Sequence, residues 1–283
     1  MMQTLLVADY SSLEIGILGD LCARLFLDDQ VIEMYQDQAR GEDMHSNNAR
    51  NVFGTWLGWT VPPAVVIEGK PALCQYAGER VDAIPAAGFK KHPFGGRLRD
   101  NIKAIWYGLS YGKGAYGFST LVGVDGKMIG EAVAGQMVDA LLSSVPGMGC
   151  WFEWVEAFVK EHHGIYSLDG RWCDLSEEMS SSDEWMHKRA YRRAYNFPMQ
   201  ATGAGIIGDA MVRVSLCPRL RALGYRIVLQ VHDELVTRGP LAHVEEAGEI
   251  LRGHMVSATA NGTKLMVPLQ VSVGHGADYF EAK

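Results

Sequence analysis

The chain has 283 residues, 48% of them hydrophobic, and its 33 acidic side chains outnumber 26 basic ones to give a net charge of −7. Such a length can bury the core of one large domain or of two subdomains. No run of 18 apolar residues suggests a membrane span, and the acidic balance is not that of a self-sufficient nucleic-acid binder. The five cysteines form no C-x-x-C pair, which argues against a zinc site and for a reducing cytoplasm.

Periodicity and turn residues predict a mixed α/β (α+β) chain. The predicted elements, in chain order, are a strand at 4–8, helices at 12–27 and 43–53, a segment rich in Pro and Gly at 55–96, helices at 98–111, 131–142 and 151–161, a turn at 169–170, a helix at 198–216, a hairpin at 225–238, a helix at 244–258 and a strand at 265–273.

The hairpin carries two carboxylates at its bend. His232, Asp233 and Glu234 lie between the apolar runs 227–231 and 235–236, so both flanks are typical of strands. Holding two carboxylates between buried strands costs free energy unless a cation binds there. The segment therefore predicts a cation site.

The strand at 4–8 also ends on a carboxylate, that of Asp9. Two aspartates that converge from the ends of two strands are the minimum for holding a pair of divalent ions, which lie roughly 3.5–4 Å apart in phosphoryl-transfer sites. Taken alone, Asp9 is better explained as a turn residue beside a helix than as a metal ligand, and His232 can be explained as a residue that bonds within its own hairpin.

A stripe of cations and aromatic rings marks the helix at 98–111. Arg99, Lys103, Tyr107 and Tyr111 follow one another at four-residue spacing, which places them along one face. Cations suit the phosphates of a nucleotide and rings suit its base and sugar. An ordinary surface helix explains the stripe about as well.

Four further patterns have simple structural explanations. Ser11 and Glu14 fit a helix capping box, and His45 fits a surface histidine near a helix start. The G-x-G-x-x-G match at 203–208 lies inside a helical run and does not follow a strand, so it does not predict dinucleotide binding. The basic and aromatic cluster at 185–193 is more often a solvated face than a track for DNA.

Taken jointly, these segments resemble family A DNA polymerases, the group of bacterial DNA polymerase I and related phage replicases. The segments that carry the resemblance, in the order of the family, are Asp9–Glu14 (motif A, D-Y-S-x-x-E), Gly41–His45 (G-x-D-x-H), Arg99–Gly112 (motif B), Leu168–Arg171, Asn196–Thr202 (N-x-P-M-Q-x-T), Val231–Glu234 (motif C) and Val273–Gly274. They extend over nearly the whole chain.

The resemblance implies a metal and nucleotide site. Asp9 and Asp233, with the backbone carbonyl of Tyr10, would hold two Mg²⁺ ions, and Glu234 belongs to the same catalytic motif. The residues that would bind the incoming deoxynucleotide are Tyr10, Glu14, His45, Arg99, Lys103 and Tyr107. Lys103 would also protonate the leaving pyrophosphate, and Glu14 would exclude a ribose 2′-hydroxyl. The residues that would contact primer-template DNA are Tyr111, Arg171, Asn196, Gln200 and His232.

The resemblance also implies a right-hand architecture. A palm with an antiparallel sheet would comprise 1–40, with motif A, and 166–283, with the hairpin. Mostly helical fingers would comprise 41–165, with an insertion at about 55–96. Because the chain starts within a few residues of motif A, no thumb is expected. We therefore expect half of a split polymerase in the cytoplasm (the host cytoplasm if phage-encoded), with a separate polypeptide that supplies the thumb and possibly a 3′–5′ exonuclease.

Two departures from the family pattern stand out: Ile15 and Gly16 replace the usual Leu-Arg of motif A, and the connection into motif B is long. The expected activity is template-directed addition of dNTPs to a primer 3′-hydroxyl. The alternatives are a single-subunit RNA polymerase-like enzyme, against which Glu14 and Glu234 argue, and a non-catalytic scaffold derived from a polymerase, against which the retained Asp9 and Asp233 argue. A metal-dependent nuclease would leave the stripe on the helix at 98–111 unexplained.

Overall fold

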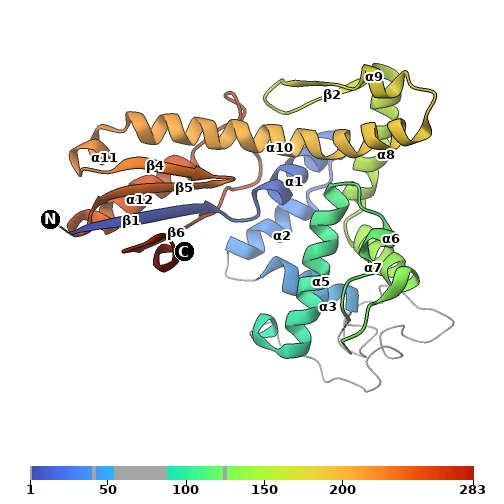
Figure 1. Cartoon of the computed structure of the whole chain (residues 1–283), viewed down its shortest axis with the longest axis horizontal. Coiled ribbons are helices and arrows are strands. Elements are labelled where there is room, and N and C mark those ends of the chain that lie inside the picture. Colours follow the sequence, from blue (N-terminus) through green and yellow to red (C-terminus); the bar gives the residue numbers. More distant parts are fainter. Residues whose placement is uncertain (1, 40–42, 54–87, 124–125) are drawn as a thin grey trace. The chain divides into compact units, whose positions relative to one another are not determined.

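The computed structural model describes residues 2–39, 43–53, 88–123 and 126–283, and the chain divides into two compact units (Figure 1). The first unit comprises residues 1–21, 164–175 and 197–283, and the second comprises 22–163 and 176–196. Most of the predicted insertion at 55–96 lies outside the described residues. The assignment of residues to palm and fingers stays a prediction.

The first unit is built on a four-stranded antiparallel sheet in the order β4-β5-β1-β6. Its strands are β1 (Gln3–Tyr10), β4 (Arg226–Val231), β5 (Glu234–Pro240) and β6 (Val271–Gly276). Leu6, Val7 and Ala8 are all buried because both faces of β1 are covered. Val7 packs with Ala282 on one face, and Leu6 lies next to Gly248, in the helix at 244–256, on the other. The continuous apolar run in β1 is thus explained by the burial of both faces rather than by alternation.

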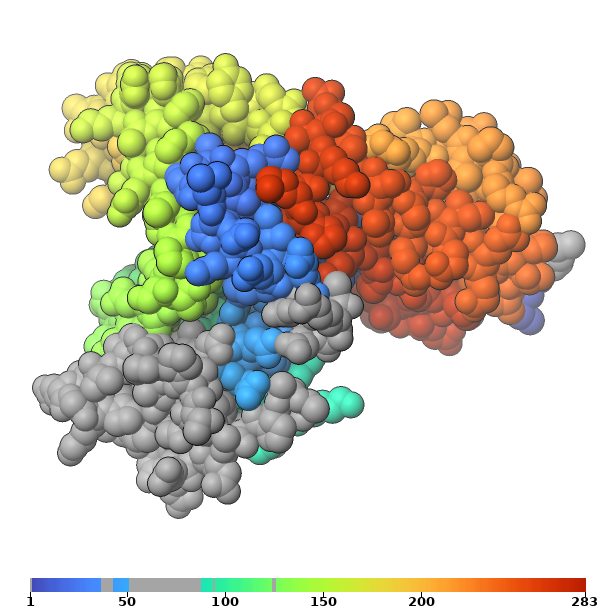
Figure 2. Space-filling view, turned by 180° about the vertical axis from the view of Figure 1, so that it is seen from behind, coloured from blue at the N-terminus to red at the C-terminus, as the bar shows by residue number. Residues whose placement is uncertain are grey.

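Two helices pack against this sheet, and one of them lies close to the edge strand β6. Helix α12 (Val244–Val256) packs against β1 and β6, and seen from behind, residues coloured orange to red cover the sheet so that little of the blue β1 strand is visible (Figure 2). Helix α13 (Tyr279–Ala282) lies so close to β6 that a Cβ atom at Gly274 would overlap the carbonyl oxygen of Ala282. The close approach of α13 therefore requires glycine in β6.

The other elements of this unit are short or are shared with the second unit. They are α1 (Leu13–Phe26), β2 (Gly164–Tyr166), β3 (Trp172–Asp174), α10 (Glu184–Leu216), α11 (Pro218–Ala222) and the 3₁₀ helix η2 (Leu241–His243). Strands β2 and β3 form a separate antiparallel hairpin. Helices α1 and α10 contribute residues to both units.

The described part of the second unit is helical. Its elements are α2 (Gln30–Ala39), α3 (Met44–Phe53), η1 (Phe89–Lys91), α5 (Pro93–Ser110), α6 (Ala115–Phe118), α7 (Gly130–Ser144), α8 (Pro146–His162) and α9 (Ser176–Met179). Helix α5 packs against α3 and α7, and α7 packs against α8. The buried rings of Trp106, Phe118 and Trp151 form its core.

The mixed helices and strands with an antiparallel sheet confirm the predicted α/β (α+β) class, and the hairpin predicted at 225–238 is β4 and β5. Four predicted boundaries were wrong by five residues or more. Helices α5 and α8 begin at Pro93 and Pro146 rather than at 98 and 151. Helix α10 begins at Glu184, so Pro198 lies inside the helix, and the last strand is 271–276 rather than 265–273. The predicted absence of a thumb stays a prediction. Among the described helices, none is long and apolar enough to cross a membrane.

Candidate active site

Asp9 and Asp233 come together at one end of the sheet. Asp9 is paired with Glu234 across β1 and β5, and the backbone N–H of Tyr10 donates to the carbonyl oxygen of Asp233 at 3.3 Å. The two aspartate carboxyl groups are close enough to affect each other's ionisation. Burial and the negative charges of Asp233 and Glu234 raise the pKa of Asp9 to about 6. Burial also raises the pKa of Asp233.

This arrangement fits a divalent cation. Two adjacent half-buried carboxylates repel each other when both are ionised, a hard cation would relieve this repulsion, and carboxylate oxygens are the ligands that Mg²⁺ prefers. Among the described residues there is no cluster of three or more His, Cys, Asp and Glu side chains that could hold a metal. The backbone carbonyl oxygen of Tyr10 stays a predicted third ligand.

The side chain of Tyr10 is buried and hydrogen-bonded within the core. Its hydroxyl donates to the carbonyl oxygen of Met255 in α12 at 2.7 Å, and its ring is nearly inaccessible. This bond ties the end of β1 to the helix beneath it. The position of the adjacent Asp9 is therefore fixed by core packing as well as by the sheet.

Glu234 is held by residues that sequence reasoning missed. Its side chain is 2% exposed, the hydroxyl of Tyr279 donates to its Oε1 at 2.8 Å, and Nζ of Lys283 lies 2.9 Å from its Oε2. Asp278 caps the short helix that presents both partners, accepting from the N–H groups of Phe280 and Glu281. No sequence pattern links Glu234 to partners 45 and 49 positions away.

His232 and Asp233 form the two-residue turn between β4 and β5, with Val231 paired to Glu234. His232 has a φ of 53°, in the left-handed region that favours glycine. Its side chain is exposed, and the amide nitrogen of Gln230 donates to its carbonyl oxygen. Asp233 is therefore the second residue of a tight two-residue turn, and the turn fixes its position at the end of the hairpin.

The predicted sugar gate contacts a predicted DNA-binding residue. The amide Nε2 of Gln200 in α10 donates to Oε1 of Glu14 in α1 at 2.5 Å. Arg171 lies in the loop between β2 and β3, where its Nε is 3.0 Å from Oδ2 of Asp169 and its Nη1 donates to the carbonyl oxygen of Ala201 at 3.2 Å. The first unit therefore holds Glu14, Gln200 and Arg171 in fixed positions.

In the second unit, Arg99 forms a paired contact with Asp43. Nε of Arg99 lies 2.5 Å from Oδ2 of Asp43 and Nη2 lies 3.0 Å from Oδ1. Burial alone would raise the pKa of Asp43, but the bonds from Arg99 and Ser46 and the charge of Arg99 lower it to about 2. Asp43 also accepts from the backbone N–H of Ser46 at 3.0 Å, which confirms it as the N-cap of α3.

His45 is buried beside this pair rather than on the surface. It is 4% exposed, and neither ring nitrogen has a hydrogen-bond partner among the described residues. Burial and the positive charges of Arg99 and Lys103 lower the pKa of His45 to about 4. A neutral imidazole with unused polar atoms among cations is a place where a bound anion would be stabilised.

Two further residues of the stripe on α5, Lys103 and Tyr107, lie near His45. The ring of Tyr107 is tilted against His45 with 5.9 Å between centroids, and Nζ of Lys103 lies 5.8 Å from the centroid of Tyr107. Lys103 and Tyr111 are exposed. The predicted stripe thus exists, but its members differ: Arg99 is 9% exposed and is held by a carboxylate.

Each unit therefore brings together one part of the predicted site. The first unit holds Asp9, Tyr10, Glu14, Arg171, Gln200, His232, Asp233 and Glu234, and the second holds His45, Arg99, Lys103, Tyr107, Tyr111 and Asn196. Asn196 is half-buried in α10. The segment 203–208 is helical throughout, as expected for a match that is not a dinucleotide loop.

Known proteins resemble this chain in sequence and in fold. The model of the family described as "DNA polymerase family A" matches residues 83–281. The thermostable DNA polymerase I of Thermus thermophilus is 30% identical over 99% of this chain and 27% of its own length. DNA polymerase I of Pseudomonas aeruginosa is 32% identical over 98% of this chain and 25% of its own. The chain thus spans about a quarter of the length of these relatives.

A solved structure agrees with this family. It is described as the POL domain of Pol1 from M. smegmatis in complex with DNA primer-template and dNTP, and it aligns with a TM-score of 0.72 and 28% identity over 99% of this chain and 40% of that one. The family model extends over more than half of the present sequence. The chain belongs to DNA polymerase family A.

Proposed function

We propose that this chain catalyses template-directed addition of deoxynucleotides to a primer 3′-hydroxyl, with two Mg²⁺ ions. The observation that carries the proposal is the contact between the Asp9 and Asp233 carboxylates at the end of the central strand. Family membership and the likeness to a polymerase domain with bound primer-template and dNTP support it.

In this mechanism Asp9, Asp233 and the carbonyl oxygen of Tyr10 hold the metal ions. When bound, Mg²⁺ activates the primer hydroxyl and neutralises charge on the triphosphate. The carboxylates can serve only when both are ionised, so metal binding would compete with protonation of Asp9, whose pKa is raised to about 6. Tyr10 keeps this backbone in place through its bond to Met255.

The nucleotide phosphates would be bound by side chains of the second unit. Lys103 is exposed and available to the phosphates, and its Nζ carries the proton that passes to the leaving pyrophosphate. His45 would donate a hydrogen bond from a ring nitrogen. Because Arg99 is engaged with Asp43, we assign Arg99 to the positioning of α3 against α5 as well as to the phosphates.

Selection of deoxynucleotides and DNA positioning would depend on the remaining residues. Glu14, fixed by Gln200, would exclude a ribose 2′-hydroxyl, and Tyr107 would pack against the sugar. Tyr111, Arg171, Asn196 and His232 would contact primer and template. Most of these contacts would reach the backbone and position the duplex without reading its sequence.

A second polypeptide that supplies a thumb, and possibly a 3′–5′ exonuclease, is part of the proposal. The net charge of −7 supports it, because an acidic chain gains little affinity from the phosphate backbone. We further propose that the protein acts in the cytoplasm, where dNTPs and DNA are both present, or in the host cytoplasm if it is phage-encoded.

Primer extension tests the proposal. The purified chain, with Mg²⁺ and dNTPs, should extend a primer, Asp233→Asn should abolish extension, and Asp139→Asn, which changes an exposed carboxylate of α7, should not. Ribonucleotides should be incorporated poorly, in contrast to an RNA polymerase. If only the mixture with a thumb-bearing protein extends the primer, the split arrangement is supported. If both variants extend the primer as well as the wild type does, the Asp9–Asp233 pair is not the catalytic site.

Binding of Mn²⁺ gives a readout that does not depend on activity. Calorimetry should detect Mn²⁺ binding to the wild-type chain and to Asp139→Asn, and much weaker binding to Asp9→Asn. A scaffold that has lost catalysis could retain this binding, so the two assays together separate a dead site from an active one. Equal Mn²⁺ binding by Asp9→Asn and wild type would contradict the assignment of the ligands.

A further inference from the structure

One face of the first half of α10 carries an aromatic ring and three cations. Trp185, Lys188, Arg189 and Arg192 follow at intervals of three, one and three residues, which places them on one side of the helix. All four are exposed, and Trp185 is 57% exposed. We call these four residues the α10 stripe.

The cations of the stripe are not used to stabilise the fold. Among the described residues, no acidic side chain is bonded to Lys188, Arg189 or Arg192. By contrast Arg193, at the margin of the same face one turn after Arg189, is paired with the buried carboxylate of Glu178. One basic residue of this helix, Arg193, therefore stabilises the fold, and the three basic residues of the stripe are available to a ligand.

The stripe is presented on a rigid element. Asp183 caps the start of α10 by accepting from the backbone N–H of Trp185 at 2.8 Å. Farther along, the hydroxyl of Tyr195 donates to Glu156 of α8 at 2.5 Å, and its ring meets Phe152 edge-on with 5.0 Å between centroids. Ordering this helix on binding therefore costs little conformational entropy.

The stem of Arg192 is also packed. A Cβ atom at Gly112, just after α5, would overlap Cγ of Arg192. The aliphatic part of Arg192 therefore lies against the loop that follows the predicted nucleotide-binding helix, while its exposed guanidinium reaches solvent. The stripe and α5 belong to the same compact unit.

We propose that the α10 stripe binds single-stranded DNA, which, if the proposed function holds, is the unpaired part of the template. Lys188, Arg189 and Arg192 contact the phosphates, and an unstacked base packs on the ring of Trp185. Basic side chains that follow a strand, combined with an aromatic ring for a base, are the usual elements of single-strand binding. An unstacked base is required because, inside a duplex, both faces of a base are covered by its stacked neighbours, whereas the bases of a single strand can unstack.

The electrostatics of the whole chain agree with this assignment. With a net charge of −7, the protein repels a polyanion at long range, so binding must depend on a local basic surface. A merely solvated helix face would account for Lys188 and Arg189. It would not account for an exposed tryptophan on the same face as three unpaired cations.

Fluorescence anisotropy with labelled oligo(dT) of about 20 nucleotides, in EDTA and without dNTPs, tests the stripe apart from catalysis. The variants are Lys188→Gln/Arg189→Gln, Trp185→Ala and Trp185→Phe. Lys160→Gln, which removes an exposed cation of α8 in the same unit, is the matched control. A blunt duplex forms the second arm.

We expect the double variant to lower the slope of log K against log salt by about 1.4, or about 0.7 for each lost phosphate contact. Trp185→Ala should weaken binding roughly 5- to 100-fold, Trp185→Phe should restore most of it, and Lys160→Gln should bind as wild type does. The blunt duplex should be affected less than oligo(dT).

Three results would overturn the proposal: no binding of oligo(dT) by the wild-type chain at low salt, an unchanged slope in the double variant, or an effect on the duplex as large as that on oligo(dT). The last would assign the stripe to duplex DNA. If oligo(dT) binding depends on the stripe but no primer is extended, the proposed function alone has failed. If primers are extended and the stripe variants bind as wild type, the inference alone has failed.

Discussion

At the scale of single residues, the Glu234 carboxylate shows how a buried charge is accommodated next to the candidate metal site. It is enclosed by Tyr279 and Lys283, both from the segment after β6. Asp9, paired with it across the sheet, would otherwise face a second uncompensated negative charge. Lys283 therefore neutralises the charge of Glu234. Without this neutralisation, Glu234 would compete with Asp9 and Asp233 for a metal ion.

Lys283→Met should destabilise the protein because it leaves the Glu234 carboxylate buried without its cation. Thermal unfolding should show a lower Tm for this variant, and Glu234→Gln/Lys283→Met should recover part of the loss because neither charge remains. Lys283→Arg should behave more like wild type. Equal Tm values for wild type and Lys283→Met would show that the ion pair is not significant in solution.

The Asp43–Arg99 pair should make stability depend on acid pH. The folded pKa of Asp43 is about 2, and an unfolded aspartate titrates near pH 4. The stabilisation is therefore fully present above about pH 4 and is lost as the pH falls from about 4 towards 2.

Urea unfolding of wild type and Asp43→Asn at several pH values measures this effect. Asparagine retains the N-cap of α3, so the difference between the two proteins reports mainly the charge. The difference should be largest near neutral pH and should shrink as the pH approaches 2. A gap that stays constant with pH would mean that the carboxylate charge contributes nothing.

At the scale of elements, the turn between β4 and β5 places a non-glycine residue where glycine is favoured. His232 has a φ of 53°, which costs roughly 1–2 kcal/mol for an ordinary residue. Glycine would remove this strain but would lose more conformational entropy on folding. Histidine at this position is therefore better explained by a ligand than by stability.

His232→Gly should leave the free energy of unfolding within about 1 kcal/mol of wild type and should weaken primer-template binding. His232→Val should be clearly less stable, because a β-branched side chain tolerates positive φ poorly. Chemical denaturation and a DNA-binding assay on the same preparations test the two effects. Unaltered DNA affinity in a well-folded His232→Gly protein would limit the histidine to a role in the turn.

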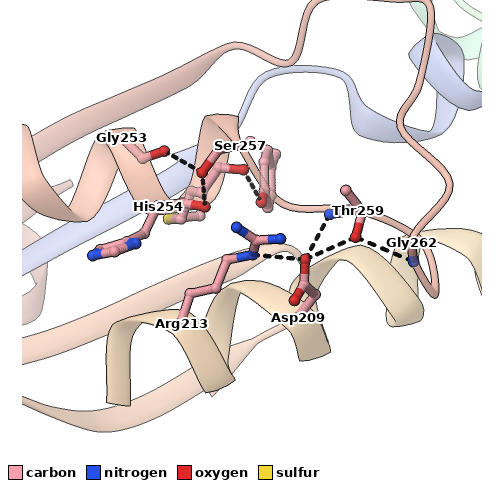
Figure 3. Close-up of polar contacts among 9 residues, drawn as sticks. Asp209, Arg213, Gly253, His254, Ser257, Thr259 and Gly262 are labelled. Atoms are coloured by element: carbon pink, nitrogen blue, oxygen red, sulfur yellow. Dashed lines mark hydrogen bonds and ion pairs between the residues drawn. The ribbon is translucent and has the colours of Figure 1, made fainter. Parts of the chain in front are cut away.

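A second element-level contact joins α10 to the loop that follows α12 (Figure 3). Oδ2 of Asp209 accepts from the backbone N–H of Thr259 at 2.7 Å, from its hydroxyl at 3.0 Å and from Nε of Arg213 at 2.8 Å. Thr259 Oγ1 in turn accepts from the N–H of Gly262 at 3.3 Å.

Asp209→Ala should therefore cost about 1–2 kcal/mol, because it leaves the backbone N–H of Thr259 without its acceptor. Asp209→Asn, which keeps one acceptor oxygen, should cost less. Asp139→Ala on the exposed face of α7 is the control for losing a helical aspartate. If Asp209→Ala and Asp139→Ala unfold at the same urea concentration, the loop does not depend on this contact.

Some elements of the fold could be predicted from the sequence and others could not, for physical reasons. Helix α5 was predicted because its stripe repeats at helical spacing, and the hairpin because alternation frames its turn. The start of α10 was missed because Pro198 is typical of a first helical turn. Residues 184–196 are held helical by tertiary contacts, such as that of Arg193 with Glu178, which no local pattern reveals.

The candidate site was predicted unevenly for the same reason. The convergence of Asp9 and Asp233 was expected because both end strands of one sheet. The burial of His45 and the engagement of Arg99 by Asp43 depend on how α3 packs against α5. Lys283 contributes through a contact that joins distant parts of the chain, and nothing in its neighbouring residues indicates it.

At the scale of the whole molecule, the acidic balance determines how the chain meets DNA. The net charge is −7, while exposed cations gather in the α10 stripe and on α5. Association with primer-template must then rest on a small number of phosphate contacts made by these local surfaces. Every such contact releases counterions, and the number released fixes the dependence on salt.

Binding of primer-template by the isolated chain should therefore be weak and moderately salt-dependent. About three phosphate contacts would lower the affinity roughly 40-fold between 50 and 200 mM salt, since each contributes about 0.9 to the slope of log K against log salt for duplex DNA. Anisotropy titrations at several salt concentrations measure this slope directly. A thumb-bearing partner should steepen it by adding contacts. A slope already near −10 for the chain alone would show that this acidic polypeptide makes many phosphate contacts by itself, which would remove the electrostatic reason for a second polypeptide.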